Sequence, residues 1–251
     1  MVSAMKPAVK YGLIALVVIV IAGGAGAFFL FKDDAPDAVS IDAAVDSVTT
    51  TTTAGGDGPG TTVAAEGVAG SWTVDASTGE FDFESASGTF AGFRIQENLA
   101  SIGATEAVGR TGDVSGTMTI DGTTVTEVSI EIDVTTITSN ESRREGKIQE
   151  ALETGEFPTA TFELTEPIDL GTGADSGETV EVDAVGDLTI HGVTKSVTFP
   201  LQAKLVDGTV VVVGSLNVTF ADYGVEVPTA PVVVSVDDNG PIELQLLFTR
   251  A

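Results

Sequence analysis

Residues 178–200 read ETVEVDAVGDLTIHGVTKSVTFP, and apolar and polar side chains alternate through most of this stretch. From residue 180 to residue 190 every second residue is apolar or glycine, whereas Glu181, Asp183 and Asp187 have the opposite parity. A period of two is typical of a β-strand with one buried face. His191 and Gly192 interrupt the pattern, which resumes downstream. The stretch therefore predicts two strands joined by a turn.

The same alternation recurs on both sides of this hairpin. Clear runs cover residues 125–134, 160–165, 196–205, 208–220 and 241–250, and weaker runs lie near residues 72–74, 80–84, 90–97 and 114–121. About eight strands are enough to close an up-and-down barrel, whereas a parallel α/β fold would need a helix between strands. The predicted fold class is therefore all-β, an antiparallel barrel of about eight strands.

One short helix is predicted in residues 139–155, because Ile148 and Leu152 share a helical face there. Ser139 or Asn140 is the candidate N-cap, and Gly155 is the candidate end of the helix. We expect this helix to pack across a mouth or a side of the barrel.

The N-terminal part of the chain is typical of a membrane signal. Residues 11–31 are uncharged and apolar, and as a helix they would be roughly 31 Å long, which matches the hydrocarbon core of a bilayer. Lysines precede this run and two aspartates follow it, which predicts a cytoplasmic N-terminus (1–10), a single-pass transmembrane anchor (11–31) and an extracytoplasmic C-terminal domain at the cell membrane. A signal peptide cleaved after residues 25–27 is the alternative.

Residues 32–70 are rich in Thr, Gly and Ala and show no apolar periodicity, so we expect a flexible linker. The barrel domain is then predicted to occupy residues 71–251. In the whole chain the net charge is −26, which argues against nucleic acid as a partner.

The residue inventory disfavours an enzyme and a metal site. The chain has no cysteine and one histidine, whereas a zinc site requires three or four ligands. No G-x-S-x-G nucleophile motif is present. We therefore predict no catalytic residues, no metal and no cofactor, and we interpret His191 as a hydrogen-bonded residue at the end of a hairpin.

The inward-facing residues of the predicted barrel are mostly aliphatic, with a few phenylalanines. Such a lining suits an elongated apolar ligand such as a lipid, although the same residues could form a filled core. Side-chain parity and size give these candidate ligand-binding residues: Phe90, Phe93, Phe162, Leu188, Ile190 and Phe199. The alternative function is a non-catalytic cell-surface scaffold with a filled barrel and an acidic partner-binding exterior.

Four segments carry a resemblance to a known family: SWTVDASTGEFDF (71–83), SRREGKIQEALETGEFPTATFEL (142–164), GDLTIHGVTKSVTFPL (186–201) and ADYGV (221–225). On these residues the chain resembles the YceI-like family of lipocalin-like polyisoprenoid-binding proteins, over essentially all of residues 71–251. The resemblance implies a barrel that holds a long isoprenoid or similar amphiphilic lipid outside the cytoplasm, for carriage, storage or sensing, without catalysis. The segment AVGRTGDVSGTMTIDGTTV (107–125) is similar to a variety of the family found after a membrane anchor. The oligomeric state stays open, a homodimer included.

Two departures from the family pattern concern the lipid head group. Many members carry a histidine after the early strand, whereas residues 90–99 contain none, and many carry an arginine where Phe220 stands here. The resemblance therefore implies the apolar tail of a ligand and not its head group.

Overall fold

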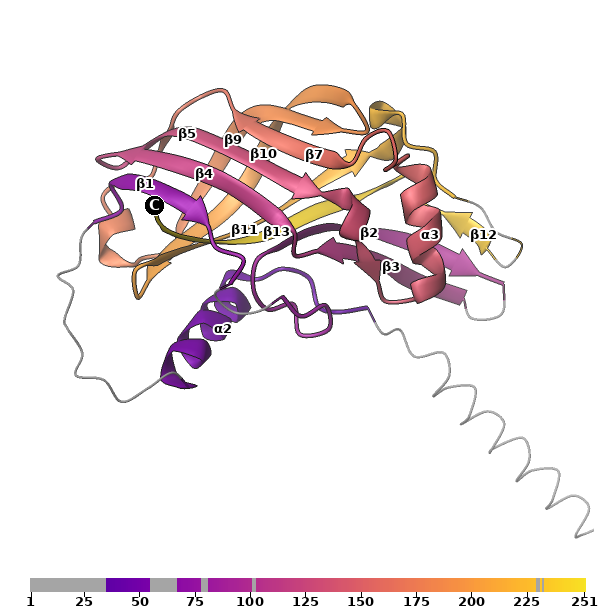
Figure 1. Ribbon diagram of the computed structural model, residues 1–251, viewed down its shortest axis with the longest axis horizontal. Helices are drawn as coiled ribbons and strands as arrows, with labels where there is room; N and C mark the ends of the chain where they lie inside the picture. Colours follow the sequence, from indigo (N-terminus) through magenta and orange to yellow (C-terminus); the bar gives the residue numbers. More distant parts are fainter. Residues whose placement is uncertain (1–34, 55–66, 78–80, 101–102, 229–230, 232) are drawn as a thin grey trace, which may run out of the picture. The chain divides into compact units, whose positions relative to one another are not determined.

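The computed structural model describes residues 35–54, 67–77, 81–100, 103–228, 231 and 233–251 (Figure 1). The predicted anchor, residues 11–31, lies outside this part of the chain. Among the helices within it, none is both long enough and apolar enough to cross a bilayer.

Eight antiparallel strands form a closed ring, in which each strand pairs with the next and the last pairs with the first. In order around the ring they are β1 (Gly70–Val74), β4 (Val114–Asp121), β5 (Thr124–Asp133), β7 (Thr159–Leu164), β9 (Val180–Ile190), β10 (Val193–Val206), β11 (Thr209–Thr219) and β13 (Asn239–Arg250). The prediction of an all-β antiparallel barrel of about eight strands is confirmed.

The sheet forks along β13, because this strand is long enough to pair with two others on the same side. Its C-terminal part pairs with β1, and its N-terminal part pairs with β2 (Phe90–Leu99). Four further strands lie at the edges. β3 (Gly103–Thr111) and β12 (Val233–Val236) pair with β2, and β6 (Thr138–Ser139) pairs with β3. β8 (Ile168–Asp169) pairs with β5.

The hairpin of β9 and β10 has the two-residue turn that the sequence indicates. Ile190 pairs with Val193, and the intervening His191 and Gly192 have φ angles of 51° and 71°. Two successive left-handed residues form the turn type whose twist matches that of antiparallel strands. The turn fixes the register of both strands, and with it the face that each side chain occupies.

The predicted helix is α3 (Ser142–Ala151), which begins and ends differently from the prediction. Its N-cap is Glu141, because Ser139 belongs to β6 and the Asn140 side chain bonds instead to the backbone of β3, at Val108 N and Glu106 O. The helix ends at Ala151, with Leu152 as C-cap, before Gly155 is reached. Ile148 and Leu152 pack against the barrel as their shared face predicts.

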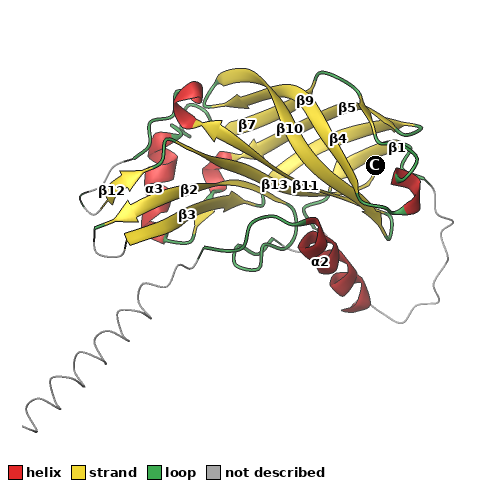
Figure 2. Ribbon diagram, turned by 180° about the vertical axis from the view of Figure 1, so that it is seen from behind, coloured by secondary structure: helices red, strands yellow, loops and turns green. Residues whose placement is uncertain are grey.

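Part of the segment expected to be a flexible linker is folded, and the described residues therefore contain a second α-helix beside the predicted α3. Residues Ile41–Ala54 form α2, which packs on the outside of the barrel (Figure 2). Ile41, Ala44 and Val48 are buried there, at the i, i+3, i+7 spacing of a helical face. Three apolar residues beside a threonine run are a weak pattern, and the helix is stabilised by packing rather than by propensity. Single-turn 3₁₀ helices complete the described elements: η1 (Val134–Thr136), η2 (Ala174–Ser176) and η3 (Phe220–Tyr223).

Candidate functional site: the interior of the barrel

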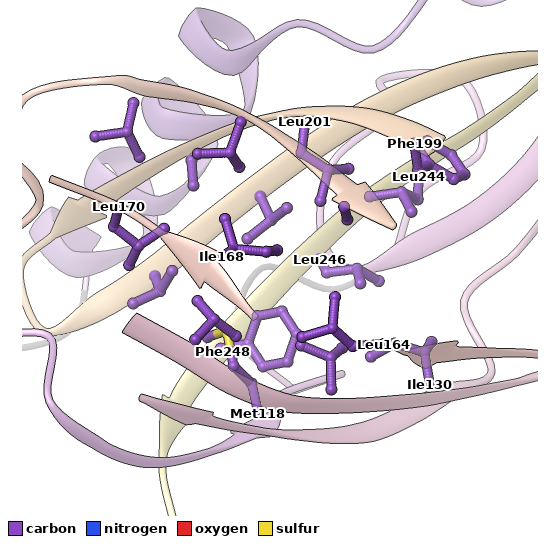
Figure 3. Close-up of a pocket in the computed structure, with 18 of the residues that line it drawn as sticks. Met118, Ile130, Leu164, Ile168, Leu170, Phe199, Leu201, Leu244, Leu246 and Phe248 are labelled. Atoms are coloured by element: carbon purple, nitrogen blue, oxygen red, sulfur yellow. The ribbon is translucent and has the colours of Figure 1, made fainter. Parts of the chain in front are cut away.

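A cavity of about 120 Å³ lies inside the barrel, and nearly all of its lining is apolar (Figure 3). The labelled lining residues come from β4, β5, β7, β8, β10 and β13 and from the residue after β8: Met118, Ile130, Leu164, Ile168, Leu170, Phe199, Leu201, Leu244, Leu246 and Phe248. An engineered apolar cavity of about 150 Å³ stays dry and binds benzene. The cavity therefore has room for an apolar group of about that size.

Strand alternation and register explain why the lining is apolar. On β10, Phe199, Leu201 and Ala203 share the inward parity, and they are registered opposite inward residues of β9. The Phe162 and Phe199 rings meet edge to face at 6.4 Å between centroids. Gly186 makes room for this arrangement, since a Cβ at that position would overlap the Phe162 ring.

Three of the six candidate binding residues line the cavity. They are Phe162, Leu188 and Phe199, which lie on three consecutive strands of the ring, β7, β9 and β10. Leu188 and Phe199 are almost fully buried.

The other three candidates lie elsewhere. Phe90 has the opposite parity to Ala91, which lines the cavity, so its ring is on the outer side against the Arg110 guanidinium, 4.5 Å from the ring centroid. Phe93 and Ile190 have inward parity, but they pack in the apolar cluster beneath α3 with Ile148 and Leu152. Phe90 was selected for its size, but its parity places it on the outer side of the barrel. Phe93 and Ile190 belong to the apolar cluster beneath α3 and do not line the cavity.

Sequence reasoning missed the lining from the segment after β7. Ile168 in β8 and Leu170 after it both face the cavity, and Ala174 in η2 lies at the same end. The signal available was the i, i+2 spacing of Ile168 and Leu170 in the short run PIDL (167–170), which is too brief to stand out as a strand.

His191 joins three elements at the α3 end of the barrel. Its Nε2 lies 2.9 Å from Glu153 Oε2, its Nδ1 lies 3.2 Å from the Tyr223 carbonyl oxygen, and its ring meets Phe157 at 4.7 Å. Within the described residues, no group of three or more His, Cys, Asp or Glu side chains is placed to hold a metal ion. The geometry agrees with the interpretation of His191 as a structural residue at a hairpin end.

Replacing His191 with Ala is expected to lower the free energy of unfolding by about 1–2 kcal/mol, because the largely buried ring loses its contacts with the Tyr223 carbonyl oxygen and the Glu153 carboxylate. Lipid uptake should not change, since the ring does not line the cavity. Urea denaturation and a lipid-displacement titration check both statements. Lys195→Ala on the same hairpin is the control, because its exposed pair with Asp222 at 3.6 Å contributes little. A folded, lipid-loading His191→Ala protein without biological activity would contradict the structural role.

A second polar site lies outside the barrel, over β2, β3 and β13, and we call it the buried charge cluster. Glu243 is 1% exposed and accepts hydrogen bonds from Arg94 Nε at 2.9 Å and from Arg110 Nη2 at 2.6 Å. Glu106 accepts a further bond from Arg94 at 2.6 Å. Two guanidinium groups and two carboxylates therefore compensate each other away from water, as buried charges require.

The two arginines of this cluster respond differently to their surroundings. Burial opposes the charge of Arg94, but hydrogen bonds and charge attraction from Glu243 and Glu106 raise its pKa above the usual value. Arg110 is fully buried and hydrogen-bonds one carboxylate, so burial outweighs attraction by Glu243 and lowers its pKa. Both guanidinium groups stay charged at any ordinary pH. Sequence reasoning passed over this cluster because its members are spread over residues 94–243.

Comparison with known proteins agrees with this architecture. The family model of the YceI-like domain matches residues 72–248. Protein YceI of Escherichia coli O157:H7 is 35% identical over 121 residues, which cover 47% of this chain and 56% of that protein. A UPF0312 protein of Shewanella denitrificans is 29% identical over 154 residues, which cover 57% of this chain and 76% of the relative. For the first relatives matched, such as a Vibrio parahaemolyticus UPF0312 protein, the chain spans 56% of their length.

Two solved structures share the fold. A polyisoprenoid binding domain from Saccharophagus degradans, implicated in plant cell wall breakdown, superposes with a TM-score of 0.52 at 17% identity, covering 72% of this chain and 98% of that domain. BcnA of Burkholderia cenocepacia gives a TM-score of 0.50 at 19% identity, covering 69% and 98%. The family match extends over most of the described barrel, from β1 to β13. The chain therefore belongs to the family of YceI-like domains.

Proposed function

We propose that this protein binds a lipid with a long, isoprenoid-type apolar tail inside the barrel and catalyses no reaction. The observation that carries the proposal is the apolar cavity enclosed by the eight strands. The naming of a structural neighbour as a polyisoprenoid binding domain supports the same ligand class. A saturated or isoprenoid tail needs no polar partner, and the cavity offers almost none.

The volume of the cavity limits the length of tail that fits without a rearrangement of the lining side chains. About 120 Å³ accommodates roughly one five-carbon isoprene unit, judged by the benzene-sized cavity above. Burial of that unit contributes up to about 4 kcal/mol, at ~0.8 kcal/mol per carbon. A longer tail fits only if lining side chains change rotamer, and Met118, Leu164 and Leu201 are unbranched at Cβ and can do so.

A filled-barrel scaffold is the second candidate, and the modest volume of the cavity favours it. In that case the interior serves stability alone, and the acidic exterior, part of a net charge of −26, binds a partner. The two candidates make opposite predictions for ligands longer than one isoprene unit.

We also propose that the protein acts outside the cytoplasm and is held at the cell membrane by residues 11–31. The apolar length of this run and the lysines before it support the anchor. A position beside a membrane suits carriage, storage or sensing of a membrane lipid.

Isoprenoid alcohols of one to four isoprene units provide the test, through displacement of a fluorescent apolar probe from the purified full chain. We expect affinity to increase at least tenfold with each added unit, equivalent to about 1.4 kcal/mol, because part of the gain from burial is spent on repacking the lining. Straight-chain alcohols of matched carbon number separate tail shape from tail length. An affinity that stops rising after the first unit would support the filled scaffold instead.

A further inference from the structure

Residues 36–48, which we call the strap, lie outside the part of the chain that the family model matches and are nevertheless built into the folded unit. They run across the outer faces of β11 and β13 and reach the buried charge cluster. Their contacts divide into a polar part, residues 36–39, and an apolar part, the first turns of α2.

The polar part of the strap completes the coordination of both buried arginines. Arg94 Nη2 donates to the carbonyl oxygens of Pro36 at 2.6 Å and Asp37 at 2.5 Å, and Arg110 Nη2 donates to Asp37 O at 2.8 Å. In addition, the Val39 amide donates to Glu243 Oε2 at 3.5 Å. Backbone carbonyl oxygens of the strap therefore accept hydrogen bonds from guanidinium N–H groups that Glu243 and Glu106 leave over, and the Phe83 carbonyl accepts a further one from Arg110 Nη1 at 3.5 Å.

The apolar part covers a patch that would otherwise face water. Val211, Val213 and Leu247 have outward parity on β11 and β13, yet each is at most 4% exposed. They are buried by Ile41, Ala44 and Val48 of α2. Because several aliphatic side chains on both sides of the contact are removed from water, the docked strap is a stable state.

Docking of the strap changes the length of free chain before the barrel. If the whole segment before β1 were a flexible linker, 38 residues (32–69) would separate the end of the apolar run at Phe31 from β1, a contour length of up to ~130 Å. With residue 36 docked, residues 32–35 are the only connection, and their contour length is at most ~14 Å. The effective tether is therefore about a tenth of its apparent length.

We propose that the strap holds the barrel at the membrane surface by shortening its tether. This inference rests on the proposed membrane anchor, residues 11–31. The barrel then exchanges lipid with the adjacent bilayer over a short distance instead of across the reach of a long stalk. Residues 55–69, which follow α2 in the sequence, then lie between the strap and β1 and not between the anchor and the barrel.

Energy transfer from the barrel to the bilayer tests the strap in the full chain, reconstituted in phosphatidylcholine vesicles that contain an acceptor-labelled lipid. The chain has no cysteine, so Ser196→Cys on the exposed face of β10 provides one site for the donor dye. Ala44→Asp buries a charge beneath α2, where Ala44 is 0% exposed, whereas the neighbouring Ala43→Asp adds the same charge on the exposed face. We expect transfer to fall by more than half in Ala44→Asp and to stay unchanged in Ala43→Asp.

Amide hydrogen exchange on the same samples reports whether the strap is docked. In the unmodified chain and in Ala43→Asp, the amides of residues 44–48 should be protected; in Ala44→Asp they should exchange freely while the β-strand amides stay protected. If Ala44→Asp leaves α2 protected, the double variant Ile41→Asp/Ala44→Asp releases it. Equal energy transfer with the strap docked and released would overturn the inference, as would an unprotected strap in the unmodified chain. A chain that does not float with the vesicles, while α2 is protected, would refute the anchor and the inference that rests on it.

Discussion

Replacement of Ala184 with Phe is expected to abolish binding of apolar ligands. Ala184 lies on β9, is 2% exposed, lines the cavity and is registered opposite Phe199. A phenyl ring at this position would fill the space that an isoprene unit would take. Loss of five buried carbons corresponds to about 4 kcal/mol, a decrease in affinity of close to a thousandfold. The displacement titration with a three-unit isoprenoid alcohol measures this loss.

Overpacking of a core costs typically about 1–3 kcal/mol, so the fold of the Ala184→Phe protein must be verified by its urea transition. Ala203→Phe on β10 is a second blocking variant at another level of the cavity. Gln202→Phe is the matched control, because Gln202 is the neighbour of Ala203 on the opposite face of the strand. A folded Ala184→Phe protein that binds the ligand as tightly as the unmodified chain would show that the ligand site lies elsewhere.

Glu243→Ala is expected to produce the largest loss of stability, about 3–5 kcal/mol, because it leaves Arg94 and Arg110 buried without their shared carboxylate. Glu243→Gln should cost less, since the amide oxygen still accepts one hydrogen bond. The loss should be the same between pH 6 and 9, because the guanidinium groups stay charged across this range. The free energy of unfolding in urea measures the effect.

Glu150→Ala is the control for this variant. Glu150 pairs with Lys147 at 2.6 Å, but both side chains are more than half exposed, so the loss of stability should be far smaller than that of Glu243→Ala. If the free energy of unfolding of Glu243→Ala is within 1 kcal/mol of that of the unmodified chain, the buried charge cluster does not stabilise the fork of the sheet and the docked strap.

Much of the barrel could be predicted from the sequence because its strands have one buried face. In β9 and β10 the alternation continues up to His191 and Gly192, and a two-residue turn leaves a single possible register. The same alternation correctly placed Phe162, Leu188 and Phe199 on the inner side. Local periodicity is sufficient to predict the register and the inward face of strands that are joined by tight turns.

Features that depend on long-range contacts could not be predicted in this way. The fork of the sheet requires β13 to pair with both β1 and β2, and Glu243 meets Arg94 and Arg110 across more than 130 residues of sequence. α2 forms because Val211, Val213 and Leu247 make an apolar patch on the outer face of the barrel. The alternation within β11 and β13 does not indicate that another segment covers this patch. Phe90 is a further example. Its parity places it on the outer side, and its burial there depends on a long-range contact with Arg110 that alternation does not indicate.

The mass of the intact protein, purified with its full chain from the membranes of cells that produce it, tests the central claim most directly. Native mass spectrometry should show the polypeptide together with a species heavier by the mass of one lipid, and mild organic extraction should remove the difference. The Ala184→Phe protein prepared in parallel should carry no added mass. A bare polypeptide mass for the unmodified protein, with no uptake of added isoprenoid, would contradict a lipid-binding barrel and leave the filled scaffold as its function.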